Sequence, residues 1–222
     1  MGNAHDGPRA VIFDLDGVLV DSEPLHVQAW RVLFEREGIS VSDEEFAMGI
    51  GMADTEWISL ILARRGRQAD PQWWREAKSE VFRDILARGL RPFPGAVDLV
   101  ERLAGEFKLG VASNSLRETI ETALRVLGIR ERFAAVVGAD DLETYKPHPE
   151  AYLKAAAALG VPPTRCTVIE DSPLGIQAAK AAGMRCAAIT TTLPAEKLGG
   201  ADLIVASLEE TETLINFARG EE

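Results

Sequence analysis

Six short apolar runs constrain the fold of this chain more than any other feature of its sequence. They are AVIFD, FKLGVAS, AAVVGAD, TVIED, CAAIT and DLIVAS. Near-continuous apolar strands are typical of a parallel sheet that is covered on both faces, and helical segments between such runs indicate crossover connections. We therefore predict an α/β fold built on a doubly wound parallel sheet.

The intervals between the later runs carry signals for helix starts and ends. In SLRETIETALRVLG, Ser115 and Glu118 have the spacing of a capping box, and Gly128 follows the last turn. In PEAYLKAAAALG, Pro149 stands at the start and Gly160 at the end. These signals predict helices between neighbouring strands.

The first interval is much longer than the others. About 90 residues separate AVIFD from FKLGVAS, whereas a crossover connection needs only about a dozen. The segments EPLHVQAWRVLFEREG, DTEWISLILARRG and DPQWWREAKSEVFRDILARG have helical patterns, and Asp70 and Pro71 are positioned to begin the last helix. We predict a helical domain at 22–90, inserted into a core domain formed by 1–21 and 91–222.

The charge balance excludes several classes of partner. The net charge is −11 at pH 7, which disfavours nucleic acid and anionic membrane surfaces. No apolar run reaches the ~18 residues of a membrane span, and the first residues carry charge where a secretory signal is apolar.

The two cysteines, Cys166 and Cys186, lie in apolar runs outside any C-x-x-C pair, which favours buried, reduced thiols. We expect a soluble, cytoplasmic monomer.

Polar residues follow the apolar runs at the points where the predicted strands end. In an open α/β sheet, functional side chains gather beyond the carboxyl ends of the strands. The residues in these positions and in the loop after the third run are Asp14, Asp16, Ser113, Asn114, Lys146, Glu170 and Asp171. The sequence thus predicts a cluster of carboxylates with one ammonium and one hydroxyl.

A cluster of carboxylates needs a cation. Two carboxylates about 4 Å apart repel by roughly 4 kcal/mol at an effective dielectric constant of 20. Asp14, Asp16 and Asp171 offer the hard oxygen ligands that suit Mg²⁺, which binds one or two carboxylates together with water and phosphate. Mg²⁺ and Lys146 would attract a phosphate to this acidic protein.

The end of the second predicted strand adds donors for an anion. Ser113 has a hydroxyl, and the backbone amides of Asn114 and Ser115 stand where a helix begins. Free amides at a helix start bind phosphate oxygens. A cation on one side and donors on the other would stabilise charge on a transferring phosphoryl group.

Four stretches resemble motifs of a known family, in the same order along almost the whole chain. They are FDLDGVLVDSEPLH, VASNS, KPHPEAY and EDSPLGIQAAKAAGM. The chain resembles the haloacid dehalogenase superfamily, and within it the β-phosphoglucomutase-like phosphatases. The resemblance implies a Rossmann-like core with a helical cap inserted after the first strand.

The resemblance also implies a role for each core residue. Asp14 looks like the nucleophile that forms an aspartyl-phosphate, and Asp16 looks like the general acid and base. Ser113 resembles the phosphate-binding hydroxyl, and Lys146 resembles the ammonium that neutralises the nucleophile and the phosphate. Dehalogenases of the superfamily lack the acid/base aspartate, so Asp16 favours phosphoryl transfer.

The metal ligands implied by the resemblance are four. Asp171 looks like a ligand of Mg²⁺, with Glu170 beside it, and Asp14 supplies a further carboxylate. In the family, the metal also binds the backbone carbonyl at the position of Asp16. Mg²⁺ is therefore the expected cofactor.

The cap is expected to distinguish a phosphatase from a mutase. Mutases of the family carry a cap arginine that holds the second phosphate of a bisphosphate, whereas GIGMADT places Gly51 and Met52 at that loop. Met52 cannot donate the charge-assisted hydrogen bonds of an arginine. His26 matches a family position on the first cap helix, and Asn114 lies at the phosphate end. These four residues are the candidate substrate contacts.

Three functions stay open at this point. The first is a Mg²⁺-dependent phosphatase that hydrolyses a small phosphorylated metabolite, expected to be a sugar phosphate. The second is a sugar phosphomutase of the β-phosphoglucomutase type, which would pass the phosphoryl group to a sugar hydroxyl instead of water. The third is a module that binds a phosphorylated ligand without turnover, which would require a missing catalytic residue; the motifs contain all of them.

Overall fold

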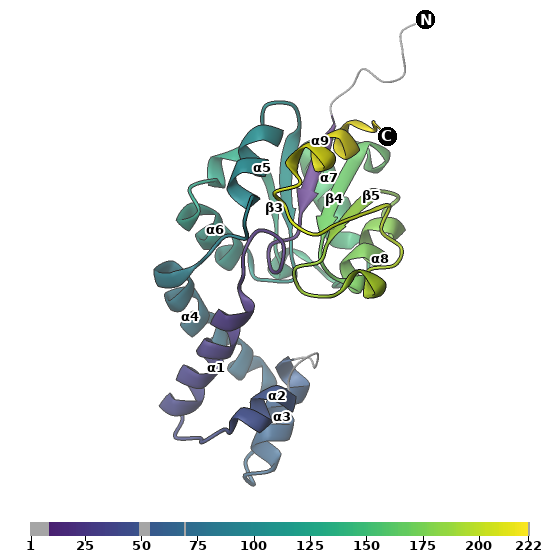
Figure 1. The fold of residues 1–222 in the computed structure, drawn as a ribbon. Helices are drawn as coiled ribbons and strands as arrows, with labels where there is room; N and C mark the ends of the chain where they lie inside the picture. Colours follow the sequence, from purple (N-terminus) through teal and green to yellow (C-terminus); the bar gives the residue numbers. More distant parts are fainter. Residues whose placement is uncertain (1–8, 49–53, 69, 222) are drawn as a thin grey trace, which may run out of the picture. The chain divides into compact units, whose positions relative to one another are not determined.

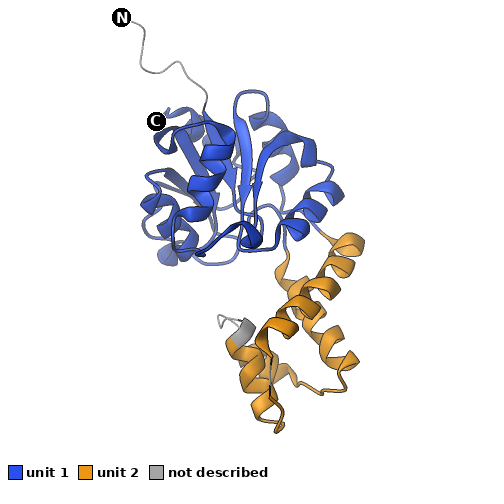
Figure 2. Cartoon of the chain, turned by 180° about the vertical axis from the view of Figure 1, so that it is seen from behind, with its two compact units in different colours: residues 1–21, 91–222 blue, residues 22–90 orange. Residues whose placement is uncertain are grey.

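The computed structural model describes residues 9–48, 54–68 and 70–221. The chain divides into two compact units, one formed by Met1–Asp21 with Arg91–Glu222 and the other by Ser22–Leu90 (Figure 2). We refer to them as unit 1 and unit 2. At the boundary, the amide of Asp21 donates to the carbonyl of Arg91 at 3.1 Å.

Unit 1 contains a six-stranded parallel sheet with the order β3-β2-β1-β4-β5-β6 (Figure 1). The strands are β1 (Ala10–Phe13), β2 (Lys108–Ala112), β3 (Phe133–Val137), β4 (Cys166–Glu170), β5 (Arg185–Ile189) and β6 (Leu203–Val205). All four residues of β1 are buried, as expected for a strand with neighbours on both sides and helices on both faces. The predicted α/β fold with a doubly wound parallel sheet is confirmed.

Helices follow most of the strands of unit 1. They are α5 (Ala96–Leu103), α6 (Arg117–Val126), α7 (Glu150–Leu159), α8 (Pro173–Ala181) and α9 (Thr211–Arg219), with 3-10 turns at Arg130–Arg132, Ala139–Asp141, Pro163–Arg165 and Ala195–Lys197. Helix α7 begins after Pro149 and ends at Gly160, which adopts the left-handed conformation that glycine tolerates at a helix end. Both signals match the sequence-based prediction.

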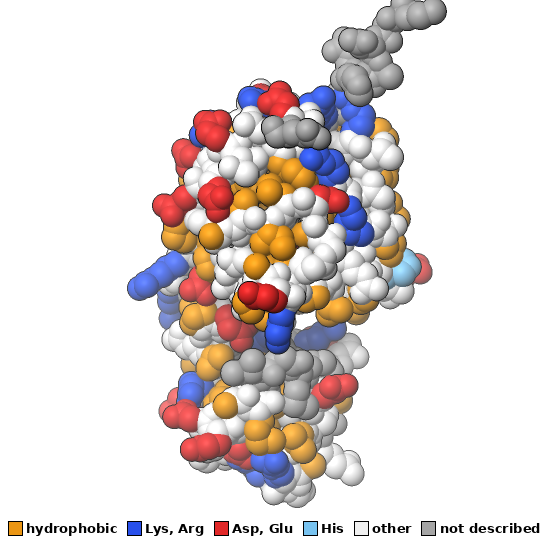
Figure 3. Space-filling view, turned by 45° about the vertical axis from the view of Figure 1, so that its right-hand side comes forward, with side chains coloured by type: hydrophobic (Ala, Val, Ile, Leu, Met, Phe, Trp, Pro, Cys, Tyr) orange, Lys and Arg blue, Asp and Glu red, His pale blue; other side chains and the backbone are white. Residues whose placement is uncertain are grey.

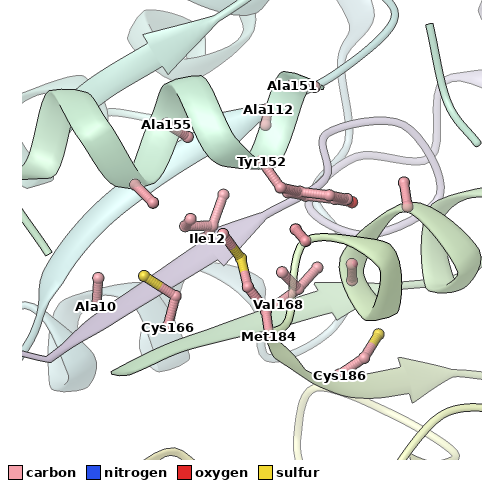
Figure 4. Packing of buried hydrophobic residues seen from close by; sticks show 14 of the residues in the cluster. Ala10, Ile12, Ala112, Ala151, Tyr152, Ala155, Cys166, Val168, Met184 and Cys186 are labelled. Carbon is pink, nitrogen blue, oxygen red and sulfur yellow. The ribbon is translucent and has the colours of Figure 1, made fainter. Parts of the chain in front are cut away.

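One face of the sheet packs against α7 and α8. Alternate residues of the strands, such as Ile12 and Val168, point to this face and meet alanines of the two helices (Figure 4). The small alanines allow close approach of helix and sheet. Cys166 and Cys186 belong to the same cluster and are free and buried, and burial raises their pKa to about 11 and about 12.

Unit 2 is a helical bundle with its own core. Its helices are α1 (Glu23–Arg36), α2 (Asp43–Met48), α3 (Asp54–Ala63) and α4 (Pro71–Gly89). Helix α4 packs against α1 and α3. The core is rich in aromatic rings, with Phe34 and Trp74 at 5.5 Å between centroids and Trp30 and Trp57 at 5.4 Å. As predicted, Asp70 caps α4 by accepting from the amides of its first turn, and Pro71 is the first helical residue.

The described helices are too short or too polar to cross a membrane. On the face shown in Figure 3, acidic side chains are interspersed with basic ones.

Candidate active site

The predicted cluster forms at the carboxyl ends of β1, β2 and β4 in unit 1. Asp14 follows β1, Ser113 follows β2, and Glu170 is the last residue of β4. Because β1 lies between β2 and β4, these three ends are adjacent. The backbone strengthens this arrangement, since the amide of Asp14 donates to the carbonyl of Ile169 at 3.0 Å.

Lys146 connects the carboxylates. It lies in the segment before α7, and its Nζ donates to Asp14 Oδ1 at 2.7 Å and to Glu170 Oε1 at 2.7 Å. The ammonium, Asp14 and Glu170 are all buried. Burial alone would lower the pKa of Lys146, but Asp14 and Glu170 raise it above its ordinary value. Lys146 is therefore a fixed positive charge beside Asp14.

Asp16 is held by two serines. Ser115 Oγ donates to Asp16 Oδ2 at 2.7 Å, and Ser113 Oγ lies 3.4 Å from the same oxygen. Ser113 Oγ also accepts from the amide of Ser115 at 3.0 Å. The predicted capping box of Ser115 and Glu118 is wrong: α6 begins only after Leu116, without a side-chain cap, and the Ser115 hydroxyl donates to Asp16.

Carboxylate oxygens of Asp14, Glu170 and Asp171 lie close enough together to hold a metal ion. Each offers a carboxylate oxygen, and the three oxygens lie within 4.8 Å of one another. Burial and the neighbouring carboxylates raise the pKa of Asp14 well above its ordinary value despite Lys146. Burial and Glu170 raise the pKa of Asp171 to about 7. A bound cation would favour the ionised form of these neighbouring carboxylates. The set of carboxylate oxygens therefore fits a divalent metal.

Glu170 differs from the two aspartates because protein donors already surround it. Its Oε2 accepts from the amides of Asp171 and Ser172 at 2.8 and 2.9 Å and from Ser172 Oγ at 3.0 Å. Burial alone would raise the pKa of Glu170, but the charge of Lys146 and hydrogen bonds from Lys146, Tyr152 and the amide of Ser172 hold it below its usual range. A Cβ at Gly175 would lie 1.6 Å from Glu170 Oε1, so only glycine fits there.

Two groups in the site were not anticipated from the sequence. Thr192 Oγ1 donates to Asp171 Oδ2, and the hydroxyl of Tyr152 donates to Glu170 Oε1 at 2.8 Å. A threonine after β5 follows the same pattern of polar residues at strand ends and was available as a signal. Tyr152 lies on a helix among alanines, and its position in the sequence gave no signal of a role in the site.

The four predicted substrate contacts are not all part of the carboxylate cluster. Asn114 is exposed, and its Oδ1 accepts from the amide of Lys146 at 3.4 Å. His26 belongs to α1 of unit 2, where its ring stacks on Phe82 at 4.0 Å between centroids. Gly51 and Met52 lie outside the described residues.

We expect Mg²⁺ to stabilise the folded chain more at pH 8 than at pH 5. The raised pKa of Asp171 means that the folded chain keeps a proton between about pH 4 and 7 that the unfolded chain has lost. Stability without metal therefore falls as the pH rises through this range, and a bound cation offsets the loss. Thermal unfolding should show a rise in Tm of about 5 °C at pH 8 with excess Mg²⁺ and a smaller rise at pH 5. An equal shift at both pH values would contradict the predicted binding of Mg²⁺ by Asp171, and Asp171→Asn should remove most of the effect.

The fold is an α/β core with a helical unit inserted into its sequence after β1. A family model described as a haloacid dehalogenase-like hydrolase matches residues 8–183. The chain therefore belongs to the haloacid dehalogenase-like hydrolase family, and the resemblance stated from its motifs is confirmed. Helices α1–α4, inserted after β1, form its cap.

Individual relatives are similar over most of this chain. Fructose-1-phosphate phosphatase YqaB of Escherichia coli is 36% identical over 174 residues, which cover 78% of this chain and 92% of the relative. SUPPRESSOR OF QUENCHING 1 of Arabidopsis thaliana is 37% identical over 190 residues, but the chain spans only 18% of that protein.

Solved structures agree with the fold. CbbY from Rhodobacter sphaeroides, crystallised with phosphate, has a TM-score of 0.79 and 30% identity and covers 92% of this chain and 96% of its own. A putative β-phosphoglucomutase from Thermotoga maritima has a TM-score of 0.79 and 28% identity, covering 94% of this chain and 99% of its own.

Proposed function

We propose that this chain is a phosphatase that hydrolyses a small sugar phosphate through an aspartyl-phosphate at Asp14. The observation that carries the proposal is the contact of Lys146 Nζ with Asp14 Oδ1 at 2.7 Å, with Asp16 two residues further on. A buried carboxylate beside a fixed ammonium can accept a phosphoryl group whose charge the ammonium neutralises. The relative that is a fructose-1-phosphate phosphatase supports the substrate class.

The reaction divides into two displacements at phosphorus. A carboxylate oxygen of Asp14 attacks, the bond from phosphorus to the sugar oxygen breaks, and Asp16 gives its proton to that oxygen. Asp16, now a carboxylate, then takes a proton from water as the water oxygen attacks the phosphorylated Asp14. Inorganic phosphate leaves and both aspartates return to their starting states.

The other residues orient the phosphoryl group. Ser113 is buried at the end of β2, and its hydroxyl is proposed to bind a phosphoryl oxygen with the amide of Asn114 beside it. Ser115 holds Asp16 in place through its hydrogen bond of 2.7 Å. Asp14, Asp171 and the backbone carbonyl of Asp16 are proposed to hold Mg²⁺, which when bound supplies positive charge against the phosphoryl oxygens.

The cap is proposed to select the substrate. We assign His26, Gly51 and Met52 as cap residues that contact it, and we expect water to be the acceptor because the motif resemblance implies that Met52 takes the position of the mutase arginine. The mutase is the alternative, favoured by the similarity to a putative β-phosphoglucomutase. The monomeric state and cytoplasmic location stay predictions.

We expect phosphate release to exceed isomerisation for every sugar phosphate tested, and to require Mg²⁺. A panel of sugar phosphates, including fructose 1-phosphate, would be assayed for free phosphate with and without a chelator. In parallel, β-glucose 1-phosphate with glucose 1,6-bisphosphate would be assayed for glucose 6-phosphate. Isomerisation faster than phosphate release would replace the phosphatase with the mutase. Binding of the panel without any turnover would favour the non-catalytic module.

A further inference from the structure

Tyr152 is a fully buried tyrosine with its polar end in the active site. It projects from α7 (Figure 4). Among the described residues, it has the largest side chain that is completely shielded from solvent. A buried tyrosine hydroxyl needs a hydrogen-bond partner. Here the partner is Glu170 Oε1, at 2.8 Å, which is a charged group and hence a strong acceptor.

The same oxygen holds the lysine of the site. Glu170 Oε1 accepts from Lys146 Nζ at 2.7 Å as well as from Tyr152, while Oε2 accepts from the backbone and side chain that follow β4. A carboxylate has about four acceptor sites. Both oxygens are thus committed to protein donors, and Glu170 is fixed in one orientation.

Tyr152 also contacts the ammonium through its ring. Lys146 Nζ lies 4.8 Å from the centroid of the Tyr152 ring, within the range of a cation–π interaction. The Tyr152 ring and Glu170 Oε1, which accepts from both residues, therefore limit the movement of Lys146 Nζ from two sides. A lysine side chain otherwise has many rotamers, so these contacts reduce its conformational freedom.

We propose that Tyr152 is a positioning residue that acts through Glu170 to hold Lys146 Nζ against Asp14. This inference rests on the proposed phosphatase function. It also assigns Glu170 as the anchor of Lys146 in preference to a metal ligand. Because a displacement of about 1 Å in an active site can reduce the rate by about a hundredfold, a group that fixes Nζ affects turnover without touching substrate.

Tyr152→Phe is the sharpest test, because it removes the hydroxyl and keeps the ring. We expect kcat to fall on the order of tenfold, with KM changed less than about twofold. Tyr152→Leu, which also removes the ring, should lose more. The control is Tyr145→Phe: the chain has two tyrosines, Tyr145 is 43% exposed, and its variant should keep the wild-type kcat. Rates are divided by the folded fraction from circular dichroism.

A second readout follows the ammonium itself. In protein labelled with ¹⁵N-lysine, the Nζ signal assigned by its loss in Lys146→Arg should shift or broaden in Tyr152→Phe and stay unchanged in Tyr145→Phe. A wild-type kcat in Tyr152→Phe, or an unchanged Nζ signal, would overturn the inference. Absence of phosphatase activity in the wild-type protein would refute the proposed function instead, and the Nζ signal would still test the positioning of Lys146.

Discussion

Asp14→Asn is expected to reduce phosphate release from sugar phosphates by at least about 10⁴-fold. The amide has the size of the carboxylate but is not a nucleophile, and it also removes one of the two carboxylates that Lys146 contacts. Steady-state assays with Mg²⁺ would measure the loss. Residual activity within about tenfold of the wild type would show that another group receives the phosphoryl group.

The same variant should remain folded. Burial and neighbouring carboxylates raise the pKa of Asp14, so the ionised side chain destabilises the metal-free protein above the pKa of an unfolded aspartate. Asparagine resembles the neutral form, and the Tm without metal at pH 8 should equal or exceed that of the wild type. Asp21→Asn is the matched control, because Asp21 lies in the same motif but is exposed, and it should keep wild-type activity.

Asp16→Asn is expected to separate two kinds of substrate. A sugar alkoxide is a poor leaving group and needs the proton of Asp16, so sugar-phosphate turnover should fall by about 10³-fold. Nitrophenolate leaves without a proton. With p-nitrophenyl phosphate, the variant should release a burst of nitrophenol and then hydrolyse phosphorylated Asp14 slowly, because the second step lacks its base.

Rapid mixing would resolve the burst, whose amplitude should approach the enzyme concentration. Ser115→Ala offers a graded comparison, because it removes the hydroxyl that donates to Asp16 Oδ2 and leaves the carboxylate. Its sugar-phosphate turnover should lie between those of the wild type and Asp16→Asn. Wild-type turnover of sugar phosphates by Asp16→Asn would show that Asp16 is not the acid.

The sheet could be predicted because its signal is local. Each strand is a short apolar run followed by a polar residue. In a parallel sheet all these polar residues lie at the same edge, whatever the order of the strands. Asp14, Ser113 and Glu170 were therefore expected to meet before the strand order was known. The order β2-β1-β4 then explains why these three residues are neighbours.

Contacts between distant side chains could not be predicted in this way. Tyr152 occupies an apolar position of α7, and its partner Glu170 lies 18 residues further along the chain, so only the packing of α7 on the sheet brings them together. Ser115 illustrates the opposite error. Its spacing to Glu118 favours a cap, but α6 begins only after Leu116, and the Ser115 hydroxyl donates to the carboxylate of Asp16, which lies far away in the sequence.

The most direct measurement is to locate the phosphoryl group during turnover. Asp16→Asn would be mixed with p-nitrophenyl phosphate and Mg²⁺, quenched at the end of the burst, treated with borohydride, which reduces an aspartyl-phosphate to homoserine, and digested for peptide mass spectrometry. The account predicts homoserine at position 14 in an amount that approaches one per enzyme, and none when Asp14→Asn is treated in the same way. Nitrophenol release without modification of Asp14, or modification of a different residue, would contradict it.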